Sequence, residues 1–549
     1  MKLKFLVFSL FLVKFQVVHG QNDNERDIEW NENDPRWEKK VPNWWDEDNF
    51  VPPVGPDEEK SKGFWNNRGQ NILKSKLEKK INENTARNVV IFIGDGMGLS
   101  TLMATRSYIG DVNRELSFEK FHHTGLAKTY CINYQVPDSA CTATAILTGV
   151  KNNYGTIGVD GNVKLRDCSA QQDKDSHLSS ILKHAQDAGK STGIVTTTRI
   201  THATPAAGYA KTSSRYWESN EFGSEGCDDV ALQLIHGDVG SKLDVAMGGG
   251  RRHFLSNTNG GGLRTDNRNL IEEFLIAKKE IGKNPQVVQN RSELMNIKAV
   301  STDSILGLFA QSHMEYKLLA DPQVQPALSE MVEKTMEILK KNDNGFVLIV
   351  EGGRIDSAHH ETTAKLALDE AVEFQNAVSV VKNLTNEDDT LIVVTSDHST
   401  VLTVGGYMPR GYNILGPGDY SRSDQMWFFS LSYANGPGYD DHINPSGGRQ
   451  NPRGKHYLDP KFRQPTTVPE DDETHAGEDV GVYANGPFSH IFTGVYEQNY
   501  IAHAIMYAAC IGPDEFLKNP QCHNNTAKNN KFSFLIFILS FITSINWII

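Results

Sequence analysis

The sequence has no long block of lysine or arginine, and its formal net charge is −13. Since proteins that bind the nucleic-acid backbone present a basic surface, this balance argues against a nucleic-acid partner. Internal repeats are absent too, and long apolar runs occur only at the two ends. The 549 residues, 38% of them hydrophobic, are nevertheless enough to bury a large core. Any anion that the protein binds must therefore be met by local positive charge.

The first apolar run has the pattern of a secretory signal peptide. Two lysines precede the apolar stretch Phe5–Val13, and Val18-His19-Gly20 is suited to cleavage, which predicts a signal peptide over residues 1–20. The alternative interpretation is a buried N-terminal strand. An acidic, tryptophan-rich extension follows over residues 21–62, and most of it has the composition of a disordered segment.

The second apolar run, Phe532–Ile549, ends the sequence. A site of small residues beginning at Asn525 and a short polar spacer precede it. Together with the signal peptide, this order predicts a glycosylphosphatidylinositol (GPI) anchor attached at Asn525, with residues 526–549 removed as a propeptide. The alternative is a helix that anchors the tail in the membrane. The GPI interpretation places the mature protein on the extracellular side of the cell membrane.

Six cysteines in a secreted chain indicate disulfide bonds. Two pairs are plausible loop closures: Cys168 with Cys227, and Cys510 with Cys522. The remaining two, Cys131 and Cys141, either pair or stay free. Three N-glycosylation sequons suit an extracellular surface: Asn290, Asn383 and Asn524.

Four short runs of apolar, β-branched residues share one design: Val89–Ile93, Ile194–Thr198, Phe346–Val350 and Leu391–Val394. Such runs are typical of strands buried on both faces, as in a parallel sheet covered by helices. A helical spacing of apolar residues lies between two of them, over Glu361–Leu384. The pattern therefore predicts an α/β fold with a central, mostly parallel sheet flanked by helices. Residues 405–470 are rich in Gly, Pro and Asn, which predicts an inserted, irregular subdomain before the sheet resumes near Gly481.

Residue types that bind metals follow these runs at their carboxyl ends. Asp95 follows the first run, His202 the second, Glu351 the third, and Asp397 with His398 the fourth. Ligands bind beyond the carboxyl ends of the strands in sheets of this kind. We therefore expect these side chains to meet at one edge of the sheet.

Asp356 and His360 are four residues apart, so on a helical turn they share one face. A carboxylate and an imidazole on one face suit Zn²⁺, and His475 adds a further imidazole. Alone, each of these residues is more often part of a solvated face or a helix cap. Their convergence on the same sheet edge is what favours a metal site.

Ser139 follows a turn at Val136-Pro137 and, with Asp138, opens a helix of small residues over Cys141–Leu147. One interpretation is structural, because Ser or Asp commonly caps a helix. The other is functional, because the first turn of a helix aims backbone N–H groups at an anion. A serine at that position is able to attack phosphorus once a metal removes its proton.

With these motifs, the chain resembles the animal alkaline phosphatases, a family of GPI-anchored metalloenzymes. The resemblance runs from about Gly63 to Cys522 and predicts a catalytic domain over residues 63–525. Six motifs carry it: Gly94-Asp-Gly-Met-Gly98, Val136-Pro-Asp-Ser139-Ala, Thr201-His-Ala-Thr-Pro205, Glu351-Gly-Gly-Arg-Ile-Asp356, Thr395-Ser-Asp-His-Ser399 and Thr474-His-Ala-Gly-Glu-Asp479.

The resemblance implies three metal sites and a phosphoserine intermediate on Ser139. Their ligands would be Asp356, His360 and His475 for one Zn²⁺; Asp95, Asp397, His398 and the reactive Ser139 for a second Zn²⁺; and Asp95, Thr204 and Glu351 for one Mg²⁺. Arg215 matches the arginine that binds the phosphate, Asp138 would orient it, and His202 would lie just outside the metal ligands. Arg215 offers two donors to two phosphate oxygens.

The chain departs from the family at three places. Cys141 stands where a small residue is usual, and Cys131 also lacks a mammalian counterpart, so the nucleophile loop carries either a bridge or free thiols. Ser357 replaces a histidine near the metal-bound waters, which bears on the pH optimum. Acidic calcium ligands are missing from Leu308-Phe309-Ala310 and from Gln325, so we predict no Ca²⁺ there.

These features together predict a broad-specificity hydrolase of small phosphomonoesters at the outer cell surface. The resemblance also implies a homodimer, with residues 405–470 as a crown at the interface and Tyr407 nearby. One alternative is a phosphodiesterase of the same superfamily, although Arg215 suggests a site closed around a terminal phosphate. A sulfatase would need a Cys-x-Pro-x-Arg segment, which Cys141-Thr-Ala-Thr-Ala does not supply. A non-catalytic surface receptor is the alternative from another class.

Overall fold

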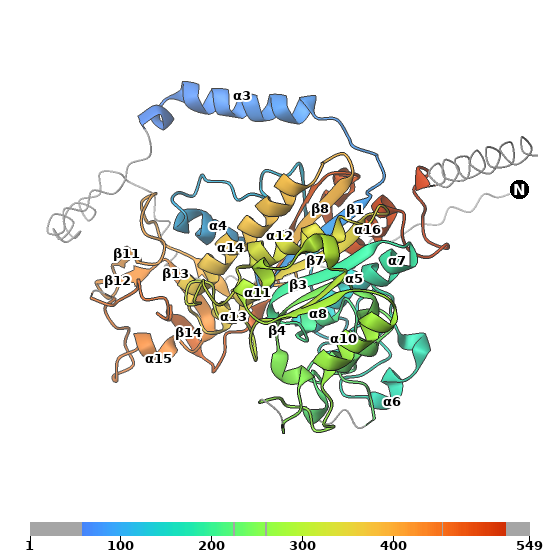
Figure 1. Cartoon of the computed structure of the whole chain (residues 1–549). Helices are drawn as coiled ribbons and strands as arrows, with labels where there is room; N and C mark the ends of the chain where they lie inside the picture. The colour runs from blue at the N-terminus through green and yellow to red at the C-terminus, as the bar shows by residue number, and fades with distance from the viewer. Residues whose placement is uncertain (1–56, 223–225, 259–260, 453, 523–549) are drawn as a thin grey trace, which may run out of the picture. The chain divides into compact units, whose positions relative to one another are not determined.

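The computed structural model describes residues 57–222, 226–258, 261–452 and 454–522 (Figure 1). The predicted signal peptide, most of the acidic extension, the sequon at Asn524 and the anchor signal at Asn525 lie outside these residues. Those four features therefore stay predictions from the sequence.

A ten-stranded sheet forms the centre of the fold, in the order β17-β2-β16-β8-β1-β7-β3-β4-β6-β5. Its strands are β1 Asn88–Gly94, β2 His123–Lys128, β3 Ser191–Arg199, β4 Val245–Gly249, β5 Pro285–Val288, β6 Ser304–Leu308, β7 Phe346–Gly352, β8 Thr390–Ser396, β16 Val480–Asn485 and β17 Gly494–Glu497. The four predicted strands are confirmed as β1, β3, β7 and β8. They are neighbours in the order β8-β1-β7-β3, and every pair among them is parallel.

The sheet is mostly parallel rather than wholly so. Strands β4, β6 and β5 continue the parallel arrangement beyond β3. On the other side, β16 runs antiparallel to both β8 and β2. Because β16 is reversed, its amino end lies at the same edge as the carboxyl ends of the parallel strands, and the segment just before it therefore reaches that edge.

Helices cover both faces of the sheet (Figure 1). They include α4 Leu99–Tyr108, α5 Ser139–Thr148, α7 Ile181–Asp187, α8 Ala203–Ala206, α9 Val230–His236, α10 Leu270–Glu280, α12 Leu328–Leu339, α13 Arg354–His360, α14 Ala364–Leu384 and α16 Tyr500–Ala509. Strand β1 shows the division, because Val89, Ile91 and Ile93 belong to the core shared with α5, α7 and α16. Val90 and Phe92, which alternate with them, belong to the core shared with α12 and α14. The α/β prediction is confirmed.

The inserted segment 405–470 contains short strands and one helical turn. These are β11 Pro417–Ser421, β12 Met426–Phe429, β13 Leu431–Gly436, α15 Tyr439–His442 and β14 Thr466–Pro469. Strands β11 and β12 form a hairpin, and β13 pairs with β10 Leu402–Val404 and with β14. A small apolar cluster that includes Leu415, Leu431 and Tyr433 holds this segment against α4 and α14.

The helix α3, Lys62–Glu78, buries none of its residues. Ser61, which precedes the helix, caps it: the Ser61 side chain accepts a hydrogen bond from the Phe64 amide. None of the helices within the described residues has both the length and the apolar character needed to cross a membrane.

Candidate metal centre and nucleophile

The carboxyl edge of the central sheet brings three predicted carboxylates together. Ile93 of β1 pairs with Glu351 of β7, and Gly94 pairs with Ser396 of β8. The next residues along β1 and β8 are Asp95 and Asp397. All three carboxylates are fully buried, so register alone concentrates negative charge beneath the sheet edge.

The predicted nucleophile lies against the first ligand cluster. Ser139 Oγ is 3.1 Å from His398 Nε2 and 3.4 Å from Asp95 Oδ1. The same His398 nitrogen is 3.2 Å from Asp397 Oδ2. The oxygen and nitrogen ligand atoms of Asp95, Asp397 and His398 all lie within 4.8 Å of one another, which is close enough to share one ion.

A second cluster forms around Asp356. Its Oδ2 lies 2.9 Å from His360 Nε2, and its Oδ1 lies 3.7 Å from His475 Nε2. The two imidazole nitrogens are 3.3 Å apart. Asp356 and His360 come from one face of α13, as the four-residue spacing predicted. His475 comes from the two-residue strand β15, His475–Ala476, which pairs with β9 Ser399–Thr400 and lies just before β16 in the chain.

A third group surrounds Glu351. Atoms of Asp95, His202 and Glu351 lie close enough to share an ion, and Thr204 is buried in α8. One carboxylate oxygen of Glu351 accepts hydrogen bonds from Thr196 and from Thr198, the latter at 3.0 Å. Its other oxygen accepts no hydrogen bond of ordinary geometry from the described residues. One Glu351 oxygen is thus fixed by hydrogen bonds, and the other is available to a cation.

Backbone carbonyls set the orientation of three imidazole rings. His360 Nδ1 lies 2.5 Å from the Glu473 carbonyl, and His475 Nδ1 lies 2.8 Å from the Pro137 carbonyl. His398 Nδ1 lies 3.2 Å from the Ser399 carbonyl. Because a carbonyl only accepts, each Nδ1 must carry a proton, and in the neutral ring each Nε2 presents a lone pair. All three Nε2 atoms face the carboxylates, in the arrangement that metal-binding histidines adopt.

Four buried oxygens make no hydrogen bond to the described residues, which suits a site for cations. They are Asp95 Oδ2, Thr204 Oγ1, Glu351 Oε1 and Asp356 Oδ1. Burial and the neighbouring carboxylates raise the pKa of Asp95 well above its ordinary value. Burial also raises the pKa values of Glu351 and Asp397 to about 7. Divalent cations would satisfy these oxygens and stabilise the charged carboxylates, and the mixed nitrogen and oxygen donors suit Zn²⁺ and Mg²⁺.

The backbone approaches the second ligand cluster closely at Gly96. Its φ is +66°, a conformation that favours glycine, and a Cβ there would lie 2.6 Å from Asp356 Oδ1. Any larger residue at this position would push against a predicted metal ligand.

Ser139 is the first residue of α5, and Asp138 is its cap. The Asp138 Oδ1 accepts hydrogen bonds from the amides of Cys141 and Gly155, at 3.3 Å and 3.0 Å. Its Oδ2 accepts one from Arg215 Nη1 at 3.0 Å. His202 Nε2 lies 3.1 Å from Arg215 Nη2, and burial and Arg215 lower the pKa of His202 well below its ordinary value. A neutral imidazole therefore accepts from the guanidinium, which is fixed on two sides.

The structure brings together every predicted site residue, and it adds some that sequence reasoning missed. Thr196 and Thr198 hold Glu351, while Thr142 Oγ1 donates to Asp397 Oδ2 at 3.3 Å. Gln498 Nε2 donates to the Asp397 carbonyl at 2.6 Å. The alternation of Thr196 and Thr198 at the end of a predicted strand was an available signal, because two hydroxyls on one face of a buried strand need a polar partner. No comparable signal marked Gln498.

All six cysteines are paired in disulfides: Cys131–Cys141, Cys168–Cys227 and Cys510–Cys522. The two predicted loop closures are confirmed. The open question at the nucleophile loop is answered by a bridge rather than free thiols.

The two other departures from the family, at Ser357 and at the missing calcium ligands, stay predictions from the sequence. Ser357 lies half-buried in α13, next to Asp356. The Gln325 side chain bonds the backbone of Glu315 through both its oxygen and its nitrogen, at 2.8 Å and 2.9 Å. The expectations about pH optimum and calcium remain to be measured. Of the sequons within the described residues, Asn383 is exposed near the end of α14.

The matching family model and the relatives described below are all alkaline phosphatases. A family model described as alkaline phosphatase matches residues 86–511. The human tissue-nonspecific isozyme of alkaline phosphatase is 43% identical over 480 residues, which cover 83% of this chain and 90% of that protein. A membrane-bound alkaline phosphatase of Bombyx mori is 45% identical over 446 residues, covering 78% and 81% of the two chains. The solved alkaline phosphatase of the Antarctic bacterium TAB5 has a TM-score of 0.55 at 23% identity, over 78% of this chain and all of the bacterial one, a likeness that concerns the fold.

Proposed function

The chain belongs to the alkaline phosphatase family and is a phosphomonoesterase, and we propose that it works through a phosphoserine on Ser139 with two Zn²⁺ and one Mg²⁺. The observation that carries this proposal is the position of Ser139 Oγ. The hydroxyl lies within 3.4 Å of both His398 and Asp95, at the amino end of a ten-residue helix. A hydroxyl at that place faces a cation-binding cluster on one side and the anion-attracting end of the helix on the other.

Three groups of residues would hold the ions. We assign Asp356, His360 and His475 to one Zn²⁺; Asp95, Asp397 and His398, with Ser139, to the second; and Asp95, Thr204 and Glu351 to Mg²⁺. When bound, such ions supply charge that lowers the pKa of a nearby hydroxyl and stabilises the leaving oxygen. The three oriented Nε2 atoms and the four buried oxygens that make no hydrogen bond to the described residues support this assignment.

Arg215 would bind the phosphate. Asp138 engages one of its nitrogens and His202 another, so the guanidinium plane is set before substrate arrives. A preset planar fork suits two phosphate oxygens and loses little entropy on binding. It also favours a terminal phosphate with free oxygens, which fits a monoester better than a diester.

The proposed reaction has two covalent steps, both involving Ser139. Attack of Oγ on phosphorus would form the oxygen–phosphorus bond of a phosphoserine while the bond to the alcohol breaks, and the alcohol leaves with a proton. Attack of water would then release inorganic phosphate and restore the hydroxyl. Both attacks are in-line displacements at one phosphorus, approached from opposite sides.

The mechanism is tested by trapping. Acid quenching during turnover of a labelled monoester should leave phosphate on the peptide that contains Ser139. Rates on a matched monoester and diester should differ by orders of magnitude in favour of the monoester. Equal rates on both esters would instead support the diesterase alternative.

We further propose that the mature enzyme is held on the outer cell surface by a GPI anchor at Asn525 and acts as a homodimer of broad specificity. Support for the location comes from the signals at both ends of the sequence and from the name of the Bombyx mori relative, which is membrane-bound. Release of activity from intact cells by a phosphatidylinositol-specific phospholipase, in a form that sediments as a dimer, would agree with both. Activity that stays in the membrane fraction, or that sediments as a monomer, would contradict the corresponding part.

A further inference from the structure

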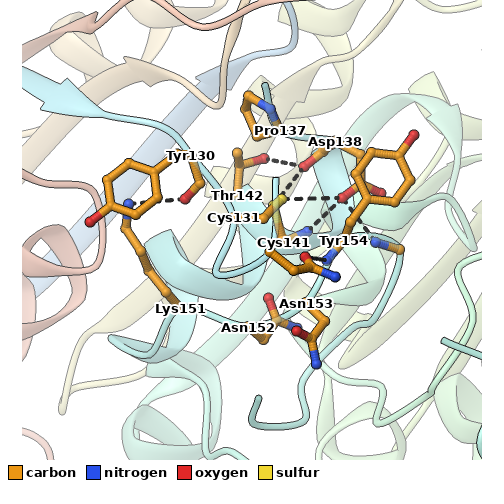
Figure 2. Close-up of a disulfide and its surroundings, with 12 residues drawn as sticks. Tyr130, Cys131, Pro137, Asp138, Cys141, Thr142, Lys151, Asn152, Asn153 and Tyr154 are labelled. Atoms are coloured by element: carbon orange, nitrogen blue, oxygen red, sulfur yellow. Dashed lines mark hydrogen bonds between the residues drawn. A yellow bond between two sulfur atoms is a disulfide. The ribbon is translucent and has the colours of Figure 1, made fainter. Parts of the chain in front are cut away.

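The Cys131–Cys141 disulfide closes the loop that carries the proposed nucleophile (Figure 2). Both cysteines are buried, with 2% of their surface exposed. Residues 132–136 between them are all exposed, whereas residues 137–140, which include Ser139, are buried. The bridge therefore ties the two buried ends of a solvent-exposed bulge, directly beside the proposed catalytic serine.

Three parts of the site depend on this loop. Ser139 itself belongs to it, and the preceding Asp138 holds Arg215 through a 3.0 Å hydrogen bond. The carbonyl of Pro137 orients His475, whose Nδ1 lies 2.8 Å away. The nucleophile belongs to this loop, and the phosphate-binding arginine and one proposed metal ligand are bonded to it, within a sequence separation of 10.

Non-covalent contacts hold the entry of the loop as well as its buried end. The Lys151 ammonium donates to the Tyr130 carbonyl at 3.0 Å, and the Ile132 amide donates to the Asn152 carbonyl at 3.1 Å. The Asn133 side chain accepts from the Tyr154 amide at 2.9 Å. These contacts fasten the entry to residues 151–154, while the bridge fastens it to α5, where the nucleophile begins the helix.

The bridge also borders the carboxylate that orients Arg215. Cys131 Sγ lies 3.9 Å from Asp138 Oδ1, and the amide of Cys141 donates to that same oxygen (Figure 2). Moving either cysteine would therefore change the surroundings of Asp138.

We propose that the Cys131–Cys141 bridge is a positioning element for phosphoryl transfer, acting through Asp138 on Arg215 and through the loop on Ser139. The inference rests on the proposed function of these two residues. It assigns the bridge a role in phosphate binding and turnover, in addition to any contribution to stability.

The matched control is the Cys510–Cys522 bridge. It closes a loop of nearly the same length, with sequence separations of 12 and 10, but it lies at the end of α16, and it bonds none of the proposed site residues. Loop-closure entropy therefore predicts similar losses of stability when either bridge is removed. Only removal of Cys131–Cys141 should alter the site.

The test compares Cys131→Ser/Cys141→Ser with Cys510→Ser/Cys522→Ser, on metal-loaded enzyme that retains a cooperative unfolding transition. We expect the first variant to lose about tenfold in kcat per phosphorylatable site and to bind inorganic phosphate, measured as a competitive inhibitor, several-fold more weakly. The control should keep both values. A purely structural bridge would reduce the amount of folded enzyme but leave kcat per site and phosphate affinity unchanged, and that result would overturn the inference.

Two additions make the result decisive. Asp138→Ala in the bridged and unbridged enzymes should be non-additive, because the bridge acts through that carboxylate; strict additivity would contradict the route. If the serine variant does not fold, Cys131→Ala/Cys141→Ala supplies a better helix former at residue 141. Failure of both to fold would make the bridge a stability element and overturn the proposal.

Ser139→Ala, measured in the same series, distinguishes a failure of the proposed function from a failure of the inference about the bridge. If Ser139→Ala retains full activity, the proposed function fails, whatever the bridge does. If Ser139→Ala is inactive while the unbridged enzyme keeps wild-type kcat and phosphate affinity, only the inference about the bridge fails.

Discussion

Two groups of acidic side chains in this fold have different surroundings. Outside the proposed ligand groups, Arg264 is fully buried and donates to Asp229 at 3.0 Å through two nitrogens and to Asp266 at 3.1 Å and 2.5 Å. At the carboxyl edge of the sheet, four buried carboxylates gather, and the neighbouring Arg215 donates to a fifth, Asp138. Those four are Asp95, Glu351, Asp356 and Asp397.

The difference separates a structural ion cluster from a metal-binding one. Arg264 donates to both carboxylates beside it; its hydrogen bonds outweigh burial and lower the pKa of the exposed Asp266, whereas burial still raises the pKa of Asp229. At the sheet edge, burial and mutual repulsion raise the pKa of Asp95, and one oxygen each of Asp95, Glu351 and Asp356 accepts no hydrogen bond from the described residues. Buried charge without a counter-charge is unfavourable by several kcal/mol, on the order of the stability of a whole domain. The guanidinium of Arg264 supplies the counter-charge of the first cluster, whereas the second cluster fits cations from outside the chain.

The largest effect should come from Ser139→Ala. Because this substitution removes the attacking oxygen and leaves the carboxylates in place, we expect activity to fall by about a thousandfold or more. Bound metal and the unfolding temperature should stay near those of the wild type. Elemental analysis beside initial rates checks both halves, and a variant that turns over at the wild-type rate with metal bound would contradict the role of Ser139.

Asp95→Asn should be the next largest in effect. Asp95 belongs to two of the ligand groups, so one lost charge weakens two ions at once. We expect activity to fall by about 100-fold or more, since groups that merely orient metal ligands already contribute about 10- to 100-fold. The matched control is Asp266→Asn, a carboxylate paired with arginine, which should keep its full metal content. Equal metal contents in the two variants would erase the distinction between the clusters.

Asp229→Asn should lower the free energy of unfolding rather than the metal content. The substitution leaves part of the buried Arg264 charge uncompensated, so we expect a loss of about 3 kcal/mol in the free energy of unfolding. Metal content and kcat per folded enzyme should not change, because Asp229 contacts none of the proposed ligands. Chemical denaturation of the metal-loaded protein measures the first quantity. Loss of metal in this variant would show that the two clusters are coupled.

The smallest effect concerns Glu218, another carboxylate neutralised by arginine. Burial opposes its ionisation, but Arg199 and His253, with hydrogen bonds from Arg199 and Thr201, lower the pKa of Glu218 to about 2. A lowered carboxylate pKa stabilises the fold fully above the unfolded value of about 4.5, and the contribution is lost as pH falls toward 2. The difference in unfolding free energy between wild type and Glu218→Gln, measured on metal-free protein, should therefore shrink across that range. A difference that is constant with pH would contradict the assignment.

Much of the metal centre was predictable because it depends on strand ends. Strands β1, β3, β7 and β8 are buried on both faces, so their sequences are continuous apolar runs, and the residue after each run necessarily lies at the site. The helix predicted from Glu361 begins instead at Ala364, after a turn in which Thr362 has a φ of +55°. No glycine or proline marks that turn, so composition could not indicate it.

What could not be predicted depends on backbone atoms and short strands. The Pro137 and Glu473 carbonyls orient two histidines, but a carbonyl is present at every residue and leaves no signature in the sequence. Strands β11–β14 are four to six residues long and interrupted by Gly and Pro, so no period develops within them. The pairing of Cys131 with Cys141 was undecided for a similar reason, because sequence spacing does not specify which cysteines meet.

The central claim is that Ser139, held against a cation-filled carboxylate cluster, accepts the phosphoryl group. The most direct test is acid quenching of the metal-loaded enzyme during turnover of a labelled monoester, followed by peptide mapping. The account predicts one phosphate per chain at most, located on Ser139, and none when the metals are removed. Label on another residue, or steady turnover with no labelled serine at any pH of quenching, would contradict it.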